Sequence, residues 1–163
     1  MRESKLRENV HKWLIQVIND PIVEILTKNS NLTKTQLETL LIDVLAENIT
    51  DKSLNFEKKA KLRLLRGGVS RGAFNRTLKQ ARRNVIKAIY TILLLGYLGF
   101  FGNTRLDPYI EIANKLHKYT SIYRNLMENK EMMREHIRVI EMLHKELEAS
   151  LEQLSKPRAL RKT

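Results

Sequence analysis

The sequence predicts an all-α protein in which an N-terminal helical domain (1–106) is followed by a long C-terminal helix (107–156). Only three prolines and six glycines interrupt 163 residues, and a hydrophobic content of 42% beside 29% charged residues is that of a folded chain. Apolar residues recur at helical spacing through most of the sequence, and a heptad repeat occupies its C-terminal part. These three observations together indicate helices throughout.

The N-terminal helices are marked by their start signals. Apolar residues at helical spacing over 6–18 are interrupted at Asp20-Pro21, and Pro21 suits the first turn of a second helix. Thr33 and Gln36 are spaced as a capping box, in which each side chain accepts the backbone N–H of the other residue. We therefore expect a third helix to begin at Thr33 and a polar break to follow it at 48–55.

A helix-turn-helix is the pattern expected over residues 56–87. A short, very basic helix over 56–66 is followed by Gly67-Gly68, which ends it. Ser70 is placed to cap the next helix, whose apolar face is made of Phe74, Leu78, Ala81, Val85 and Ile89. Two helices joined by a tight glycine turn, the second with basic and amide side chains on its outer side, are typical of this DNA-binding motif.

The net charge of the chain comes from one window. Residues 58–106 contain twelve of the 30 lysines and arginines but no aspartate or glutamate, and the rest of the chain carries equal numbers of both signs. The window therefore accounts for the whole formal charge of +12. Each cation on such a surface releases a counterion when it meets a phosphate, and no carboxylate opposes the contact. We expect double-stranded DNA as the partner.

Residues 68–82, GVSRGAFNRTLKQAR, resemble the recognition helix of the sigma-factor region 4 type of helix-turn-helix. The family's pattern falls at Gly68, Val69, Ser70, Phe74, Leu78 and Ala81-Arg82. The resemblance implies that the side chains facing the major groove are those of Arg71, Gly72, Asn75, Arg76 and Lys79. The preceding helix departs from the family, because leucines stand where a small alanine is usual and the turn is one residue longer. The resemblance therefore extends to the DNA-reading helix and not to the role of a sigma factor.

The chemistry of these side chains suits DNA independently of the resemblance. Arginine can donate two hydrogen bonds to guanine, and asparagine can pair with adenine in the major groove. The N-terminus of the helix adds a partial positive charge beside a phosphate. Phosphate contacts are expected from the neighbouring residues Lys58, Lys59, Lys61, Ser70, Arg82 and Arg83.

The heptad repeat runs from Tyr109 to Leu154, and twelve of its fourteen a and d positions are apolar or aromatic. This length favours a coiled coil, with one continuous helix pairing with a second copy of the chain. A helical hairpin that breaks near Asn129 is the alternative, and a short basic tail follows at 157–163. The dimerisation seam is expected to contain Leu116, Tyr119, Tyr123, Leu126, Met133, Ile137, Ile140, Leu147, Leu151 and Leu154.

Several classes of protein fit the sequence poorly. The chain has no cysteine, so it has no disulfide, thiolate metal site or cysteine nucleophile, which suits a reducing interior. No phosphate loop, nucleophile elbow or cluster of metal ligands is present, and we expect no catalysis, cofactor or metal. The uncharged stretch 88–101 is shorter than the roughly 20 residues that span a bilayer. We therefore expect a buried core helix there and no membrane partner.

The working hypothesis is a homodimeric, sequence-specific DNA-binding protein of the cytoplasm and nucleoid that regulates transcription. A contact with the transcription machinery is a further partner that this role allows. A helix-turn-helix followed by a long dimerising helix also resembles the plan of small DNA-binding regulators of archaea. The alternatives are an architectural, chromosome-organising protein with little sequence preference, and a coiled-coil adaptor that binds RNA or an acidic protein.

Overall fold

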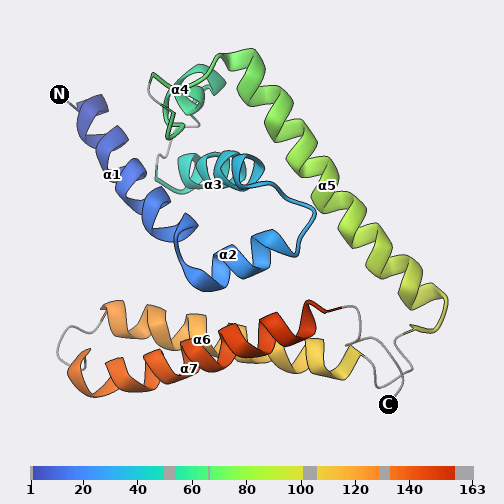
Figure 1. Ribbon diagram of the computed structural model, residues 1–163. Coiled ribbons are helices and arrows are strands. Elements are labelled where there is room, and N and C mark those ends of the chain that lie inside the picture. The colour runs from blue at the N-terminus through green and yellow to red at the C-terminus, as the bar shows by residue number, and fades with distance from the viewer. Residues whose placement is uncertain (1, 50–53, 66, 101–105, 129–132, 157–163) are drawn as a thin grey trace. The chain divides into compact units, whose positions relative to one another are not determined.

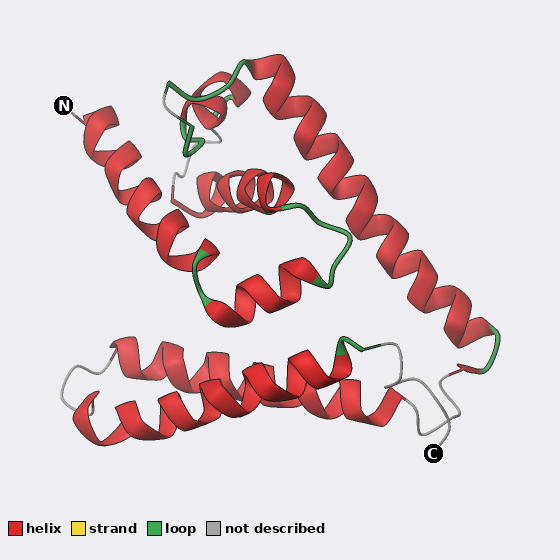
Figure 2. Cartoon of the chain, in the orientation of Figure 1, coloured by secondary structure: helices red, strands yellow, loops and turns green. Residues whose placement is uncertain are grey.

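The protein is all-α in the computed structural model, which describes residues 2–49, 54–65, 67–100, 106–128 and 133–156 (Figures 1 and 2). No strand occurs among these residues, so the all-α part of the predicted fold class is confirmed. The chain divides into two compact units, Met1–Leu93 and Leu94–Thr163. The helices are α1 (Arg2–Ile18), α2 (Pro21–Lys28), α3 (Lys34–Ile49), α4 (Phe56–Lys61), α5 (Arg71–Tyr97), α6 (Asp107–Glu128) and α7 (Met133–Leu154).

The predicted helix starts of the first unit are confirmed by their hydrogen bonds. Asp20 Oδ1 accepts the Val23 N–H at 3.1 Å at the start of α2, with proline in the first turn. Thr33 N–H donates to Gln36 Oε1 at 3.1 Å, and Gln36 N–H donates to Thr33 Oγ1 at 3.2 Å. Such caps satisfy N–H groups that the helix itself leaves unpaired, and each contributes about 1 kcal/mol of stability.

The core of the first unit joins α1, α3, α4 and the N-terminal half of α5. Leu14 on α1, Ile42 on α3 and Phe74 on α5 are completely buried, and Figure 1 shows α3 lying between α1 and α5. Ala60 and Leu62 bring α4 and its C-terminus into the same cluster. The first turns of α5 therefore share one cluster of buried side chains with α1, α3 and α4.

The helix expected over 56–66 ends at Lys61, five residues early. Leu62 is the C-cap of α4, and the chain after it turns toward α3, where the backbone N–H of Leu64 donates to Glu38 Oε1 at 2.6 Å. In a longer α4, the Leu64 N–H would donate to a carbonyl oxygen of the helix itself. The Glu38 carboxylate accepts this N–H instead. The glycine turn then follows, with φ of +86° at Gly67 and +76° at Gly68.

Gly68 allows α4 and α5 to approach each other closely. A Cβ at this position would lie 2.8 Å from the Ala60 carbonyl oxygen and 2.8 Å from Lys61 Cα, closer than side-chain carbons come to backbone atoms. The next residue, Val69, donates its N–H to the same Ala60 oxygen at 3.1 Å. Gly68 is thus required both by its backbone conformation and by the space available.

The second unit is a helical hairpin, which corrects the prediction of one continuous C-terminal helix. The hydroxyl of Tyr109 on α6 donates to the Leu154 carbonyl oxygen on α7 at 2.9 Å, and the rings of Tyr119 and His144 lie 5.8 Å apart. Ten residues forward on α6 thus correspond to ten residues back on α7, so the helices are antiparallel. The heptad pattern is compatible with a continuous helix and with a hairpin. An apolar seam can pack against a helix of a second copy or against a helix of the same chain.

Ion pairs reinforce the hairpin on its outer side. Lys115 Nζ lies 2.8 Å from Glu146 Oε1 on α7 and 3.1 Å from Glu111 Oε1 on its own helix. The hydrogen bond to Glu146, and then that to Glu111, raises the pKa of Lys115. These groups are solvent-exposed, so the pairs select the register of the hairpin more than they stabilise it.

The uncharged stretch after Lys87 does not form the buried core helix that the sequence predicted. Only Phe74, Leu78 and Ala81 of the expected α5 face are buried, whereas Val85 and Ile89 are 38% and 50% exposed. No helix within the described residues is long and apolar enough to cross a membrane.

A substitution of Gly68 by alanine should destabilise the first unit. The added Cβ meets backbone atoms, and the left-handed conformation costs a non-glycine residue about 1–3 kcal/mol. We expect Gly68→Ala to lower the midpoint of thermal unfolding, measured by circular dichroism, clearly more than Gly67→Ala. Gly67 is the matched control because it shares the positive φ but has no atom within 4 Å of a built Cβ. Equal effects of the two substitutions would contradict the close approach.

Candidate nucleic-acid interface

The exposed side of α5 follows directly from how the helix begins. Ser70 Oγ accepts the Ala73 N–H at 3.2 Å, so Ser70 is the N-cap that the sequence predicted. Phe74, Leu78 and Ala81 then face the core and determine which side of the helix faces solvent. That solvent side carries Gly72, Arg76, Lys79 and Arg83, which follow one another at spacings of four, three and four residues.

The candidate base-reading residues differ in how accessible they are. Arg71, Gly72, Arg76 and Lys79 are exposed. Asn75 is half-buried at the flank of the helix, and its Oδ1 is buried and accepts no hydrogen bond in the described part of the chain. Four of the five residues implied by the resemblance are therefore on the surface, and Asn75 needs a rotation of its side chain to present its amide.

Asp43 on α3 binds two of the cations that were expected to contact phosphate. Its Oδ1 lies 2.6 Å from Lys59 Nζ, and both side chains are about 5% exposed. Its Oδ2 lies 2.6 Å from Arg82 Nη2 on α5. Lys59 is 4% exposed and paired with Asp43, so its side chain does not contribute to the exposed positive surface, where a phosphate contact was predicted for it. Arg82 retains an exposed edge, but its guanidinium ties α5 to α3.

A second buried ion pair uses another cation of the acid-free window. Arg63 Nε lies 2.9 Å from Glu38 Oε1, and its Nη1 donates to Thr39 Oγ1 at 3.0 Å. Both ends of this pair are buried. Neither pair was predicted. The one signal for them in the sequence is that Arg63 lies between two leucines.

The remaining cations lie on the surface. Arg71, Arg76, Lys79, Arg83 and Lys87 form no ion pair within the described residues of the chain. Lys58 is also exposed, and Lys61 lies 3.6 Å from Glu57 in a solvent-exposed pair. The positive surface is therefore concentrated along α5, with α4 beside its N-terminal half.

A shallow groove of about 410 Å³ runs along the flank of α5 beside α4. Phe56 and Leu78 supply apolar surface, and Lys79 and Arg83 border it with positive charge. The groove lies beside the row of exposed cations on α5 and extends to Asn75. Its apolar side chains border the positive surface on that side. It lies in the part of α5 where the sequence placed the contacts with bases.

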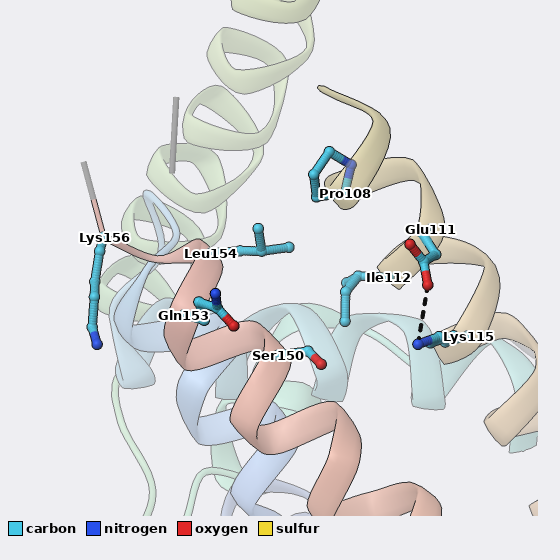
Figure 3. Close-up of a pocket in the computed structure, with 8 residues that line it drawn as sticks. All are labelled: Pro108, Glu111, Ile112, Lys115, Ser150, Gln153, Leu154 and Lys156. Atoms are coloured by element: carbon cyan, nitrogen blue, oxygen red, sulfur yellow. Dashed lines mark ion pairs between the residues drawn. The ribbon is translucent and has the colours of Figure 1, made fainter. Parts of the chain in front are cut away.

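A second groove, of about 440 Å³, lies in the hairpin where α6 begins and α7 ends (Figure 3). Pro108, Ile112 and Leu154 line it beside the paired Glu111 and Lys115. Ser150, Gln153 and Lys156 on α7 and the residues after it complete the lining. No group of three or more potential metal ligands occurs among the residues that the structure describes.

The described part of the predicted dimerisation seam packs within one chain. Leu147 and Leu151 are buried inside the hairpin. Leu116, Tyr119 and Leu154 are half-buried there. Dimerisation through this seam stays a prediction. The remaining positions have side chains outside the described set: Tyr123, Leu126, Met133, Ile137 and Ile140.

Comparison with known proteins yields no relative. No protein-family model, no curated protein and no solved structure matches this chain. The function therefore rests on the residues and geometry described above.

Lys59 and Lys61 provide a matched pair of substitutions that separates a structural cation from a surface cation. Removing one partner of a buried ion pair costs about 3–5 kcal/mol, whereas an exposed pair contributes about 0–1 kcal/mol. We expect Lys59→Ala to lower the free energy of unfolding in urea by several times the change seen in Lys61→Ala. The double substitution Asp43→Asn with Lys59→Met should recover part of this loss. Equal stabilities of the two single variants would contradict the burial of Lys59.

Proposed function

We propose that this protein binds double-stranded DNA through the exposed face of α5 between Arg71 and Lys87, as a sequence-specific regulator of transcription. The observation that carries the proposal is a row of cations, without any acidic residue in the helix, opposite a face anchored in the core. Anchoring matters because a rigid helix presents its cations in a constant geometry. Each phosphate contact then costs little conformational entropy.

The dimensions of the helix suit the major groove. The stretch from Arg71 to Lys87 is about 24 Å long at 1.5 Å per residue. The major groove is about 12 Å wide and admits one α-helix. The capped N-terminus adds its partial positive charge at the end where Arg71 lies.

Gly72 supports close contact with a partner at the start of α5. A Cβ at this position would have no atom within 4 Å, so packing inside the chain does not explain the glycine. A glycine within a helix destabilises it by up to about 1 kcal/mol relative to alanine. Gly72 follows Arg71 directly and precedes Arg76 by about one helical turn. An exposed backbone at such a position fits the close approach of a DNA strand to the helix.

Sequence preference and charge neutralisation make separable contributions to this proposal. Arg71, Arg76 and Lys79 can each donate hydrogen bonds to guanine, which reads sequence, whereas Arg83 and Lys87 suit phosphates. Binding to a selected site that survives an excess of random DNA would support a regulator. Binding that random DNA abolishes would instead support the architectural alternative.

Replacing the central cations should weaken DNA binding and flatten its dependence on salt. We expect the triple variant Arg76→Ala, Lys79→Ala and Arg83→Ala to bind a duplex at least tenfold more weakly. The logarithmic salt slope should fall by about 0.9 for each phosphate that the variant no longer neutralises. Fluorescence anisotropy over a series of salt concentrations would measure both. Lys12→Ala is the control, because Lys12 is an exposed α1 lysine paired with Glu8. An unchanged affinity and slope in the triple variant would refute the proposed interface.

Gly72→Ala should separate stability from DNA binding. The added methyl group meets no atom of the chain and favours the helix, so the free energy of unfolding should stay the same or rise by up to about 1 kcal/mol. DNA affinity should fall, because the methyl group occupies the space where the DNA strand approaches. The two quantities would be measured by urea unfolding and anisotropy on the same preparation. A variant that binds DNA as tightly as the original protein would rule out close approach at Gly72.

A further inference from the structure

The C-terminal half of α5 exposes a large apolar surface. Eight large apolar side chains between Ile86 and Leu98 are each at least half exposed, and Tyr97 is 90% exposed. Their combined exposed area is on the order of 800 Å², more than the roughly 300–600 Å² of the largest apolar patch on a typical monomer. A helix that is apolar on several sides is expected to be covered by another surface.

Part of this surface has the spacing of a helix-pairing seam. Ile86, Tyr90, Leu93 and Tyr97 follow one another at four, three and four residues, which is the alternation of a and d positions in a coiled coil. They are 53%, 67%, 59% and 90% exposed. The same alternation continues backward on the same face through the cations Arg83, Lys79 and Arg76. One face of α5 is therefore cationic in its first half and apolar in its second.

We propose that this apolar seam, made of Ile86, Tyr90, Leu93 and Tyr97, binds the same seam of a second copy of the chain. Ile89 and Leu94 flank the four seam residues on the helix surface and are also at least half exposed, so a second helix laid along the seam would cover six large apolar side chains. Lys87 lies beside the first seam residue, and no charged residue occurs from Ala88 to Leu98, so two copies can meet along the rest of the seam without opposing like charges. Elsewhere the chain carries its net charge of +12, which repels a second copy.

The hairpin of the same chain is a poorer occupant because of its own surface. Its described apolar seam already faces inward between α6 and α7, with Leu147 and Leu151 buried. Among the described side chains of α6 and α7, Ile110 and Met142 are the large apolar residues that are exposed. A second α5 offers a matching row of large apolar side chains, and the described side chains of the hairpin offer no such row.

The seam would be tested on the full chain without DNA, by sedimentation equilibrium over a range of protein concentrations. We expect the original protein to be a dimer, and we expect Tyr90→Glu and Leu93→Glu each to raise the dissociation constant roughly 30-fold or more, as for a central interface residue. Thr91→Glu is the matched control. Thr91 is exposed and adjacent in sequence but points about 100° away from the seam, so this variant should remain a dimer. Circular dichroism should show the same helix content in all four proteins.

Three results would overturn the proposal. The first is an original protein that sediments as a monomer at every concentration. The second is a dimer that Tyr90→Glu and Thr91→Glu weaken equally, or that neither weakens. The third is a monomer that binds phosphatidylcholine vesicles unless Tyr90 is replaced by glutamate, which would assign the seam to lipid. Because the assay contains no DNA, each of these results leaves the proposed DNA interface untouched, and loss of DNA binding in the triple variant leaves the seam untouched.

Discussion

The first unit depends on two carboxylates that α3 places in its interior. Glu38 and Asp43 are buried, and a buried carboxylate is tolerated only when cations and hydrogen-bond donors surround it. The following segment supplies them, with Lys59 and Arg82 bound to Asp43 and Arg63 bound to Glu38. These contacts end α4 early, bend the chain toward α3 and attach α5 to it. Together with the burial of Phe74, Leu78 and Ala81, the pair between Arg82 and Asp43 holds α5 with its cationic face toward solvent.

The same network divides the basic window into two groups of cations. Lys59 and Arg63 point inward and are neutralised, so they add nothing to the positive surface. The cations of α5 that point outward keep their charge, because the helix contains no acid and its opposite face is occupied by Phe74, Leu78 and Ala81. The positive surface is smaller than the sequence charge implies, but it is concentrated on one rigid helix. Such a surface favours an extended anionic partner over a small one.

The antiparallel hairpin changes where self-association can occur. A heptad seam of this length is usually a surface for a partner, but the hairpin covers its described positions from within the same chain. A run of exposed apolar residues lies instead on α5, directly after the cations. If two copies meet there as proposed, the proposed DNA-binding half and the proposed pairing half belong to one continuous helix, and that helix sets the distance between the two cationic surfaces.

Local interactions made part of this structure predictable from the sequence, and contacts between distant residues decided the rest. The all-α class, the caps at Asp20 and Thr33, and the start of α5 at Ser70 depend on neighbours within a few residues. The end of α4, the burial of Lys59 and the pairing of Arg82 depend on Glu38 and Asp43, which are 16 to 39 residues away. The heptad repeat determined that an apolar seam exists. Only the tertiary structure decided that the seam of α6 packs against α7 of the same chain. The spacing of apolar residues shows that a helix face must be buried, but it does not show which surface buries it.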